Sequence, residues 1–166
     1  MLQKTGEKMA IFFNGRGEEN REFKNTSPHS FTLDGEQWRS AEHYVQAQRF
    51  NCSEIQAEVR ESTYPFSAKT IARERPEALR PDWHEIRDAV VEKAVRSKFQ
   101  SHPDLSEKLC ATGEAEIIEA SAMSHHWGAG ADGLGKNILG RILMKIRQDI
   151  KESLQMSGDT TENRIG

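Results

Sequence analysis

The residues best suited to binding an anion lie in one glycine-rich stretch, HHWGAGADGLGKNILGRILM, at residues 125–144. Within it, Gly130, Gly135 and Lys136 spell G-x-x-x-x-G-K, which is close to the phosphate-binding P-loop. The next residue, Asn137, lacks the hydroxyl group that a P-loop gives to magnesium, and no predicted strand leads directly into Gly130. The sequence therefore disfavours a P-loop.

The same glycines also resemble a dinucleotide-binding turn. Gly128, Gly130 and Gly133 spell G-x-G-x-x-G, a pattern that needs a strand before it and an acidic residue about 20 positions later, at the end of a second strand. Asp149 lies near that distance, but it falls inside a helical pattern. Dinucleotide binding is disfavoured as well.

An anion site at a helix terminus remains possible for this stretch. Asn137 is a candidate N-cap, and the apolar residues after it recur at helical spacing: Ile138, Leu139, Ile142, Leu143, Ile146 and Ile150. A helix N-terminus offers free N–H groups and partial positive charge. Lys136 adds a cation where the helix dipole disfavours one, a local conflict of the kind that often marks a site. The alternative is a glycine-rich connector with a solvated lysine.

Composition limits the class of protein. The chain has 166 residues, of which 36% are hydrophobic and 30% charged, and this suggests one stable domain. Its net charge of −3 argues against nucleic-acid binding by the whole surface, but not by a local basic pocket. No apolar run has the length of a membrane span, and the N-terminus shows no signal peptide. We expect a cytoplasmic protein that does not contact a membrane.

Metal and cofactor motifs are not recognisable. Cys52 and Cys110 match no metal-binding spacing, and the histidines form no zinc-binding pair. We expect no metal and no cofactor.

The chain reads as helices with a few short strands. The expected elements are a strand at 10–13, a polar loop at 14–30, a hairpin at 31–39 turning at Asp34-Gly35, a helix from a Ser40 cap to about Arg60, helices at 67–75 and from Trp83 to about Phe99, a helix after Asp104, a strand at 116–121 and a long helix from Asn137. The prediction is a mainly α domain (α+β with a few short strands) over residues 10–152. A flexible leader at 1–9 and a polar, disordered tail at 153–166 would flank it.

Several segments together resemble one family. FTLDGEQWRSAEHYVQAQRF, WHEIRDAVVEKAVRSKFQSHPDLSEKLCATGEAEIIEAS and HHWGAGADGLGKNILGRILMKIR resemble, in order and spacing, the NADAR family over roughly residues 10–152. The resemblance implies a compact, single-domain, mainly helical YbiA-like fold without a metal. It also implies cleavage of an N-glycosidic bond in a phosphoribosyl or ADP-ribosyl compound. The implied substrates are phosphoribosylamino-pyrimidine intermediates of riboflavin synthesis, or ADP-ribose attached to a nucleobase such as guanine, including ADP-ribosylated nucleic acid.

The matched positions supply candidate residues. The family's motif residues fall on Asn25, Glu42, Trp83, Trp127, Lys136 and Asn137. Three departures stand beside them. The early block reads Phe23-Lys24-Asn25-Thr26, Arg49 stands where many relatives have lysine, and Ser124 stands where relatives usually have aspartate. An arginine stays protonated and cannot form an imine with a sugar, so a lysine-imine route would need another lysine, such as Lys24.

The implied chemistry gives these residues roles. Cleavage develops positive charge on the ribose ring, which a fixed carboxylate stabilises, and Glu42 is the candidate for that carboxylate. A first-turn helix carboxylate with no function is its alternative. His43 is a candidate proton donor to the leaving base, or else a solvated or capping residue.

The remaining candidates would bind substrate. The aromatic residues could stack on the base or pack in the core, and the glycine stretch could bind phosphate. The substrate-binding set is Lys24, Asn25, Tyr44, Gln48, Arg49, Trp83, Trp127, Gly128, Gly130, Asp132, Gly133, Lys136 and Asn137. If Ser124 and Arg49 abolish catalysis, the alternative is a module that binds ADP-ribose or a related nucleotide.

Overall fold

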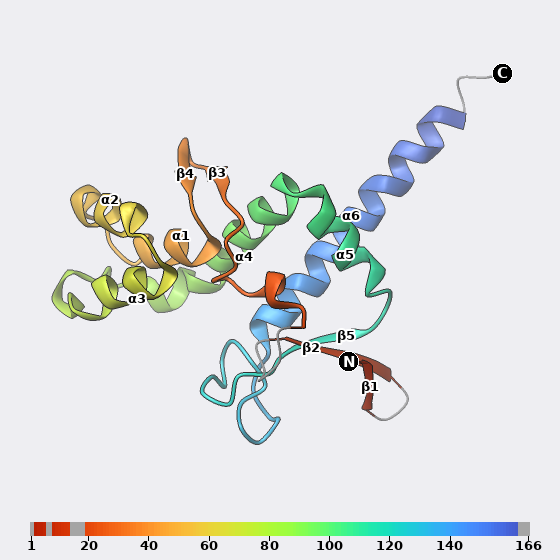
Figure 1. Cartoon of the computed structure of the whole chain (residues 1–166), viewed down its shortest axis with the longest axis horizontal. Coiled ribbons are helices and arrows are strands. Elements are labelled where there is room, and N and C mark those ends of the chain that lie inside the picture. Colours follow the sequence, from red (N-terminus) through yellow and green to blue (C-terminus); the bar gives the residue numbers. More distant parts are fainter. Residues whose placement is uncertain (1, 6–7, 14–18, 163–166) are drawn as a thin grey trace. The chain divides into compact units, whose positions relative to one another are not determined.

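The computed structural model describes residues 2–5, 8–13 and 19–162, shown in Figure 1. Over these residues the chain has six α-helices, five short strands and two 3-10 turns. The prediction of a mainly α fold with a few short strands is confirmed. The chain forms two compact units, one built from residues 1–19 and 103–166 and the other from residues 20–102.

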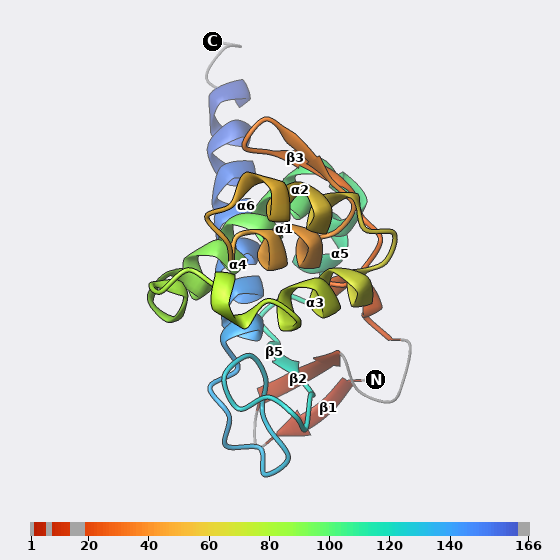
Figure 2. The ribbon, with the colours of Figure 1, turned by 90° about the vertical axis from the view of Figure 1, so that its left-hand side faces the viewer.

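Helix α1 is the centre of the unit at residues 20–102. The elements of this unit are η1 (Arg21–Phe23), β3 (Phe31–Leu33), β4 (Glu36–Trp38), α1 (Ala41–Ala47), α2 (Ser53–Glu61), α3 (Pro65–Arg73), η2 (Pro76–Ala78) and α4 (Trp83–Ser101). Helices α2, α3 and α4 all pack against α1, as Figure 2 shows. All seven residues of α1 are consequently buried, including its polar ones.

The predicted hairpin is confirmed. Phe31 pairs with Trp38, and both turn residues, Asp34 and Gly35, have positive φ angles of 54° and 79°. Two positive φ angles in a two-residue loop are typical of a type I′ turn, which asparagine, aspartate and glycine favour. The Asp34 carboxylate accepts hydrogen bonds from the Tyr44 hydroxyl (2.8 Å) and the Lys93 ammonium (2.6 Å), and these bonds lower the pKa of Asp34. Through these bonds, Tyr44 of α1 and Lys93 of α4 hold the turn in place.

The predicted single helix from Ser40 to Arg60 is wrong, because α1 ends at Ala47 and α2 begins at Ser53. Between them the chain is extended enough for Phe50 to form a bridge with Leu79. The Arg49 carbonyl accepts the Arg80 N–H group at 2.8 Å, and Phe50 is fully buried. This long-range pairing takes the place of continued helical hydrogen bonds.

The second unit combines a small sheet with two helices. Its elements are β1 (Leu2–Thr5), β2 (Lys8–Phe13), α5 (Pro103–Ala111), β5 (Glu116–Glu119) and α6 (Ile138–Glu162). The strand order is β1-β2-β5, with β1 antiparallel and β5 parallel to β2. Helix α6 packs on β5 and α5 through the predicted apolar stripe, of which Leu139, Ile142, Leu143 and Ile146 are buried.

The ends of the chain differ from the expected secondary structure. The first nine residues, expected to be a flexible leader, include β1 and the start of β2, which pair with each other. Helix α6 continues through most of the expected tail to Glu162, while residues 163–166 lie outside the described part. Residues 14–18 of the expected polar loop also lie outside it, and the rest of that loop contains η1.

Gly140 lies in the first turn of α6, directly against β5. A Cβ atom at this position would overlap the Ile117 carbonyl oxygen and the Asn137 side chain. A packed neighbour therefore accounts for glycine inside a helix, where it is otherwise about 1 kcal/mol less favourable than alanine.

We expect Gly140→Ala to destabilise the protein by about 1–3 kcal/mol, because overpacking outweighs the better helix propensity of alanine. Urea unfolding of parent and variant measures the difference. Arg141→Ala, at an exposed position of the same turn, is the control and should stay within about 0.5 kcal/mol of the parent. A more stable Gly140→Ala variant would contradict the close packing of α6 on β5.

Candidate functional site

Glu42 is a buried carboxylate held by contacts of its Oε1 atom and of its backbone. Ser40 caps α1 as predicted, and its hydroxyl oxygen lies 3.5 Å from the His43 N–H group. Only 6% of Glu42 is exposed; its Oε1 accepts a hydrogen bond from Gln46 Nε2 (2.7 Å) and lies 3.6 Å from Lys69 Nζ. Its backbone N–H donates to the Asn25 carbonyl at 2.9 Å. A buried carboxylate fixed in this way can stabilise positive charge without reorganising.

Arg49 continues this network. Its Nη1 donates to Gln46 Oε1 at 2.9 Å, so Gln46 connects the carboxylate of Glu42 to the guanidinium of Arg49. The guanidinium carbon lies 5.9 Å from the centre of the Trp83 ring, within cation–π range. Burial lowers the pKa of Arg49, and the charge of Glu42 opposes that shift. Its Nε is buried and has no hydrogen-bond partner among the described residues.

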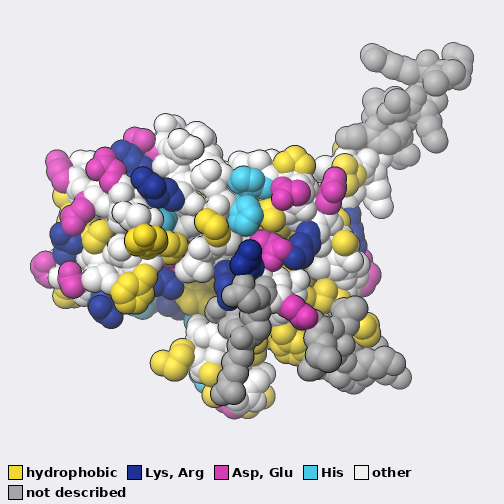
Figure 3. Space-filling model, viewed as in Figure 1, with side chains coloured by type: hydrophobic (Ala, Val, Ile, Leu, Met, Phe, Trp, Pro, Cys, Tyr) yellow, Lys and Arg dark blue, Asp and Glu magenta, His cyan; other side chains and the backbone are white. Residues whose placement is uncertain are grey.

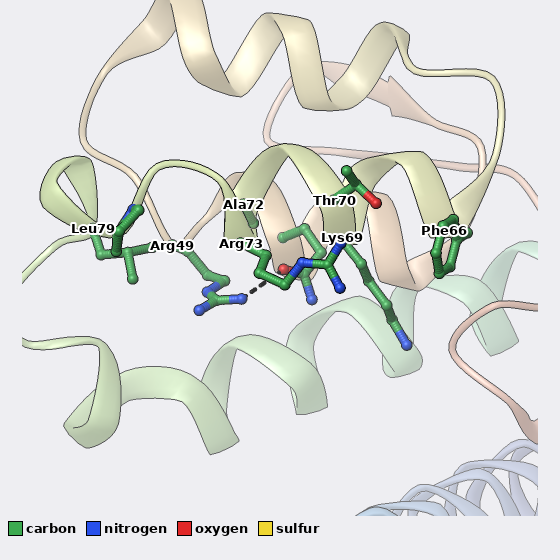
Figure 4. Close-up of a pocket in the computed structure, with 9 residues that line it drawn as sticks. Arg49, Phe66, Lys69, Thr70, Ala72, Arg73 and Leu79 are labelled. Carbon is green, nitrogen blue, oxygen red and sulfur yellow. Dashed lines mark hydrogen bonds between the residues drawn. The ribbon is translucent and has the colours of Figure 1, made fainter.

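A cavity of about 460 Å³ opens beside this network. Figure 4 shows it beneath α3, with Arg49, Lys69 and Arg73 on the same side of that helix and Phe66 in its first turn. The lining residues are Gln46, Arg49, Phe66, Lys69, Thr70, Ala72, Arg73, Pro76 and Leu79. Three of these are cationic and none is acidic. Over the face shown in Figure 3, in contrast, basic and acidic side chains are interspersed.

Lys98 anchors the turn that brings Asn25 to Glu42. Lys98 is fully buried in α4, and its Nζ donates to the carbonyls of Glu22 (2.8 Å) and Lys24 (3.1 Å) and to Ser27 Oγ (3.2 Å). Burial lowers the pKa of Lys98 to about 7. The side-chain oxygen of Asn25 is buried without a hydrogen-bond partner in the described part of the chain.

His43 and Tyr44 do not reach the cavity. His43 is 1% exposed; its Nδ1 lies 2.8 Å from Ser40 Oγ and its Nε2 lies 3.1 Å from the Ser62 carbonyl. Burial lowers the pKa of His43. The ring of Tyr44 packs edge-on against Trp38, and burial and its bond to Asp34 raise the pKa of its hydroxyl. Both side chains are held by partners in the core of this unit, and their roles as proton donor and stacking surface stay predictions.

Gln48 is also placed outside the cavity lining. It ends α1, where its backbone N–H donates to the Tyr44 carbonyl at 3.0 Å. The lining residue from this helix is Gln46, one helical half-turn away.

The glycine-rich stretch lies in the other unit, and most of its hydrogen bonds join residues of the stretch itself. Gly130 and Gly133 have positive φ angles, and a Cβ atom at Gly128 would overlap Glu119. The carboxylate of Asp132 accepts the Leu134 N–H group at 3.0 Å. Glycine is needed here for the path and packing of the loop.

Five successive amide groups of this stretch donate to carbonyls of the same unit. The N–H groups of Gly135, Lys136, Asn137, Ile138 and Leu139 bond to the carbonyls of Ala129, His125, Gly128, His126 and Trp127, respectively. The expectation of free N–H groups at the start of α6 is therefore wrong at these positions. The Asn137 side chain does not cap α6, because its Oδ1 accepts the Glu119 N–H group and its Nδ2 donates to the Ile117 carbonyl.

The structure thus brings some of the predicted site residues together. For the others, a place in the same site stays a prediction. Asn25, Glu42, Arg49 and Trp83 belong to one connected neighbourhood in the unit at residues 20–102. Lys24 takes part through its backbone carbonyl, which Lys98 binds. Trp127 and the exposed Lys136 belong to the other unit, so a cleft shared with Glu42 stays a prediction.

Sequence reasoning missed the residues of α3. Phe66, Lys69, Thr70 and Arg73 recur at helical spacing on one side of α3, and the fully buried Ala68 lies on the other side. That pattern was the available signal, because it distinguishes a cationic face from a core face.

Neither a metal site nor a membrane span is evident in the described part of the chain. These residues contain no group of three or more histidine, cysteine, aspartate or glutamate side chains arranged to hold a metal ion. None of the helices formed by them is long and apolar enough to span a membrane.

Comparisons with known proteins identify the family of the chain. The model of the NADAR domain matches residues 11–151. N-glycosidase YbiA from Escherichia coli is 33% identical over 149 residues, which cover 90% of this chain and 93% of that protein. Riboflavin biosynthesis protein VVA0006 from Vibrio vulnificus is 39% identical over 142 residues, 86% of this chain but 39% of the relative. The NMR structure of E. coli YbiA matches with a TM-score of 0.82 over 92% of this chain and 91% of that one, in agreement with the expected YbiA-like fold.

Proposed function

The chain belongs to the NADAR domain family, and from this premise we propose that it is an N-glycosidase that hydrolyses the N-glycosidic bond of a ribose-phosphate or ADP-ribose conjugate. The observation that carries the proposal is the buried carboxylate of Glu42, fixed by Gln46 and Lys69 beside a cationic cavity. Relatives named as N-glycosidases and as a riboflavin biosynthesis protein support this class of reaction.

Glu42 suits the electrostatic demand of this reaction. As the bond between C1′ and the base nitrogen breaks, the ribose ring becomes oxocarbenium-like and positively charged. A carboxylate already held in position stabilises that charge and can orient or deprotonate the attacking water. The water oxygen then bonds to C1′, and the base leaves with the electron pair of the broken bond and takes up a proton.

Arg49 cannot itself form a covalent imine, so Lys69 is the amine that the cavity lining offers. A guanidinium does not lose its proton at neutral pH, so it cannot act as the amine nucleophile. Lys98, the buried lysine of this unit, is engaged by three acceptors and is fully covered. Arg49 instead offers a fixed positive charge beside Glu42, on the face of Trp83.

Ser124, which stands where relatives usually have aspartate, still holds the turn from residue 124 to residue 127. Ser124 Oγ accepts the Trp127 N–H group at 3.0 Å, a bond that an aspartate oxygen at the same position could also accept. The change from aspartate to serine thus preserves the placement of the Trp127 backbone.

Incubation with a panel of ribosyl compounds tests the proposal. The panel contains a phosphoribosylamino-pyrimidine, ADP-ribosyl guanine, ADP-ribosylated oligonucleotide and their dephosphorylated analogues. Mass spectrometry should find free base together with free sugar phosphate or ADP-ribose, and the best substrate would identify the class. Binding of these compounds without base release would instead favour the nucleotide-binding module.

A further inference from the structure

We propose that the phosphate of the substrate binds in the α3 cavity, on Arg49, Lys69 and Arg73, and not on the glycine-rich stretch. The ligand class is a sugar carrying a phosphate monoester or a diphosphate. The inference rests on the proposed function for the identity of the sugar, but it concerns a binding site that can be measured without catalysis.

The α3 helix presents a cationic, solvent-exposed face to the cavity. Lys69 and Arg73 are four residues apart, so they lie on one side of the helix, where like charges repel and destabilise it. Such a local cost is expected where a site needs the charge. Figure 4 shows both side chains leaving α3 on the side where Arg49 approaches from the end of α1.

The positive charge of the cavity exceeds its negative charge. Three cationic side chains line it, while Glu42 is the carboxylate that pairs with one of them, Lys69, at 3.6 Å. Arg49 Nε is buried without a hydrogen-bond partner among the described residues, and the side chain of Arg73 is exposed at the cavity. A cavity with surplus positive charge attracts a doubly charged phosphate and offers it bidentate guanidinium donors.

The remaining lining fits a sugar rather than an isolated ion. Phe66, Pro76 and Leu79 give the cavity an apolar side, and Phe66 is 72% exposed at its edge. The volume of about 460 Å³ falls within the range of about 300–1,000 Å³ that is typical of small-molecule sites. The sugar would then lie along this apolar side, next to the Lys69–Glu42 pair.

At the competing location, the amide groups that lead into α6 are already hydrogen-bonded. The five successive amides from Gly135 to Leu139 all bond to backbone carbonyls, so they cannot also form an anion nest without opening the loop. Lys136 alone remains there as an exposed cation.

Calorimetric titration with ribose 5-phosphate tests the assignment, with ribose as the uncharged control and ADP-ribose as the diphosphate. Arg73→Ala and Lys69→Ala should each weaken binding of the preferred phosphate about ten- to a hundredfold, the range for a hydrogen bond to a charged group, and leave ribose binding unchanged. Arg73→Lys should recover part of the loss. Arg75→Ala is the matched control, because Arg75 pairs with Glu58 and does not line the cavity.

Lys136→Ala should bind like the parent. Loss of phosphate binding in Lys136→Ala, with Arg73→Ala and Lys69→Ala unaffected, would place the phosphate on the glycine-rich stretch and overturn the assignment. Failure of the parent to bind either phosphate would overturn it too. If the parent binds phosphate through Arg73 but releases base from no compound of the panel, the proposed reaction fails and this binding site stands.

Discussion

Glu42→Gln should lower kcat about 10²- to 10³-fold, a loss of roughly 2.7–4 kcal/mol of transition-state stabilisation, while binding of the ribosyl ligand is retained. Glutamine has the same shape as glutamate, and its side-chain oxygen can still accept the hydrogen bond from Gln46 Nε2. What disappears is the negative charge that faces the oxocarbenium-like ribose. The change therefore removes an interaction that is strongest in the transition state, which lowers kcat without raising the dissociation constant.

The measurement combines base release with calorimetry on the same preparations. Glu58→Gln, which neutralises the partner of Arg75 outside the cavity, is the control and should turn over substrate like the parent. Unfolding curves of both variants verify that the fold is intact. Parent-like turnover by Glu42→Gln would remove Glu42 from the catalytic role and return it to the status of a first-turn helix carboxylate.

Asn137→Ala should destabilise the protein by about 3–5 kcal/mol. The substitution leaves two buried backbone groups of β5 unpaired, the Glu119 N–H group and the Ile117 carbonyl, at about 1–3 kcal/mol each. It also places alanine at a φ angle of 49°, where asparagine is tolerated better than other side chains. Urea or thermal unfolding measures the loss.

Asn137→Gly separates the two contributions. Glycine accepts the left-handed backbone but makes neither side-chain hydrogen bond, so it should regain about 1 kcal/mol relative to alanine. If Asn137 were mainly a ligand-binding residue, both variants would unfold within about 1 kcal/mol of the parent and differ from it in affinity. That outcome would contradict the structural role assigned to the side chain.

Local patterns were sufficient wherever the interactions were local. The Asp34-Gly35 turn, the Ser40 cap and the apolar stripe from Leu139 to Ile146 depend on residues a few positions apart, and all three were predicted correctly. The resemblance of the motif blocks identified the family, which the NADAR model over residues 11–151 confirms.

Local patterns failed where a distant partner outweighed them. Phe50 continues a helical pattern, but its bridge to Leu79 and its complete burial end the helix. Asn137 has the side chain of an N-cap, yet two hydrogen bonds to β5 use it instead. The glycines suggested an anion loop, but carbonyls of the same unit accept hydrogen bonds from the five amide groups of Gly135 to Leu139.

The sequence alone therefore determined the fold class, the family and the catalytic candidate Glu42, because these depend on helical periodicity and on motif residues read in order. Only the tertiary structure decided that His43 and Tyr44 are buried, that Gln46 joins Glu42 to Arg49, and that α3 supplies a cationic cavity. The physical reason is that burial and hydrogen-bond partners are set by segments that meet in space. A polar side chain on a helix has the same sequence signature whether it faces the core, a cavity or water.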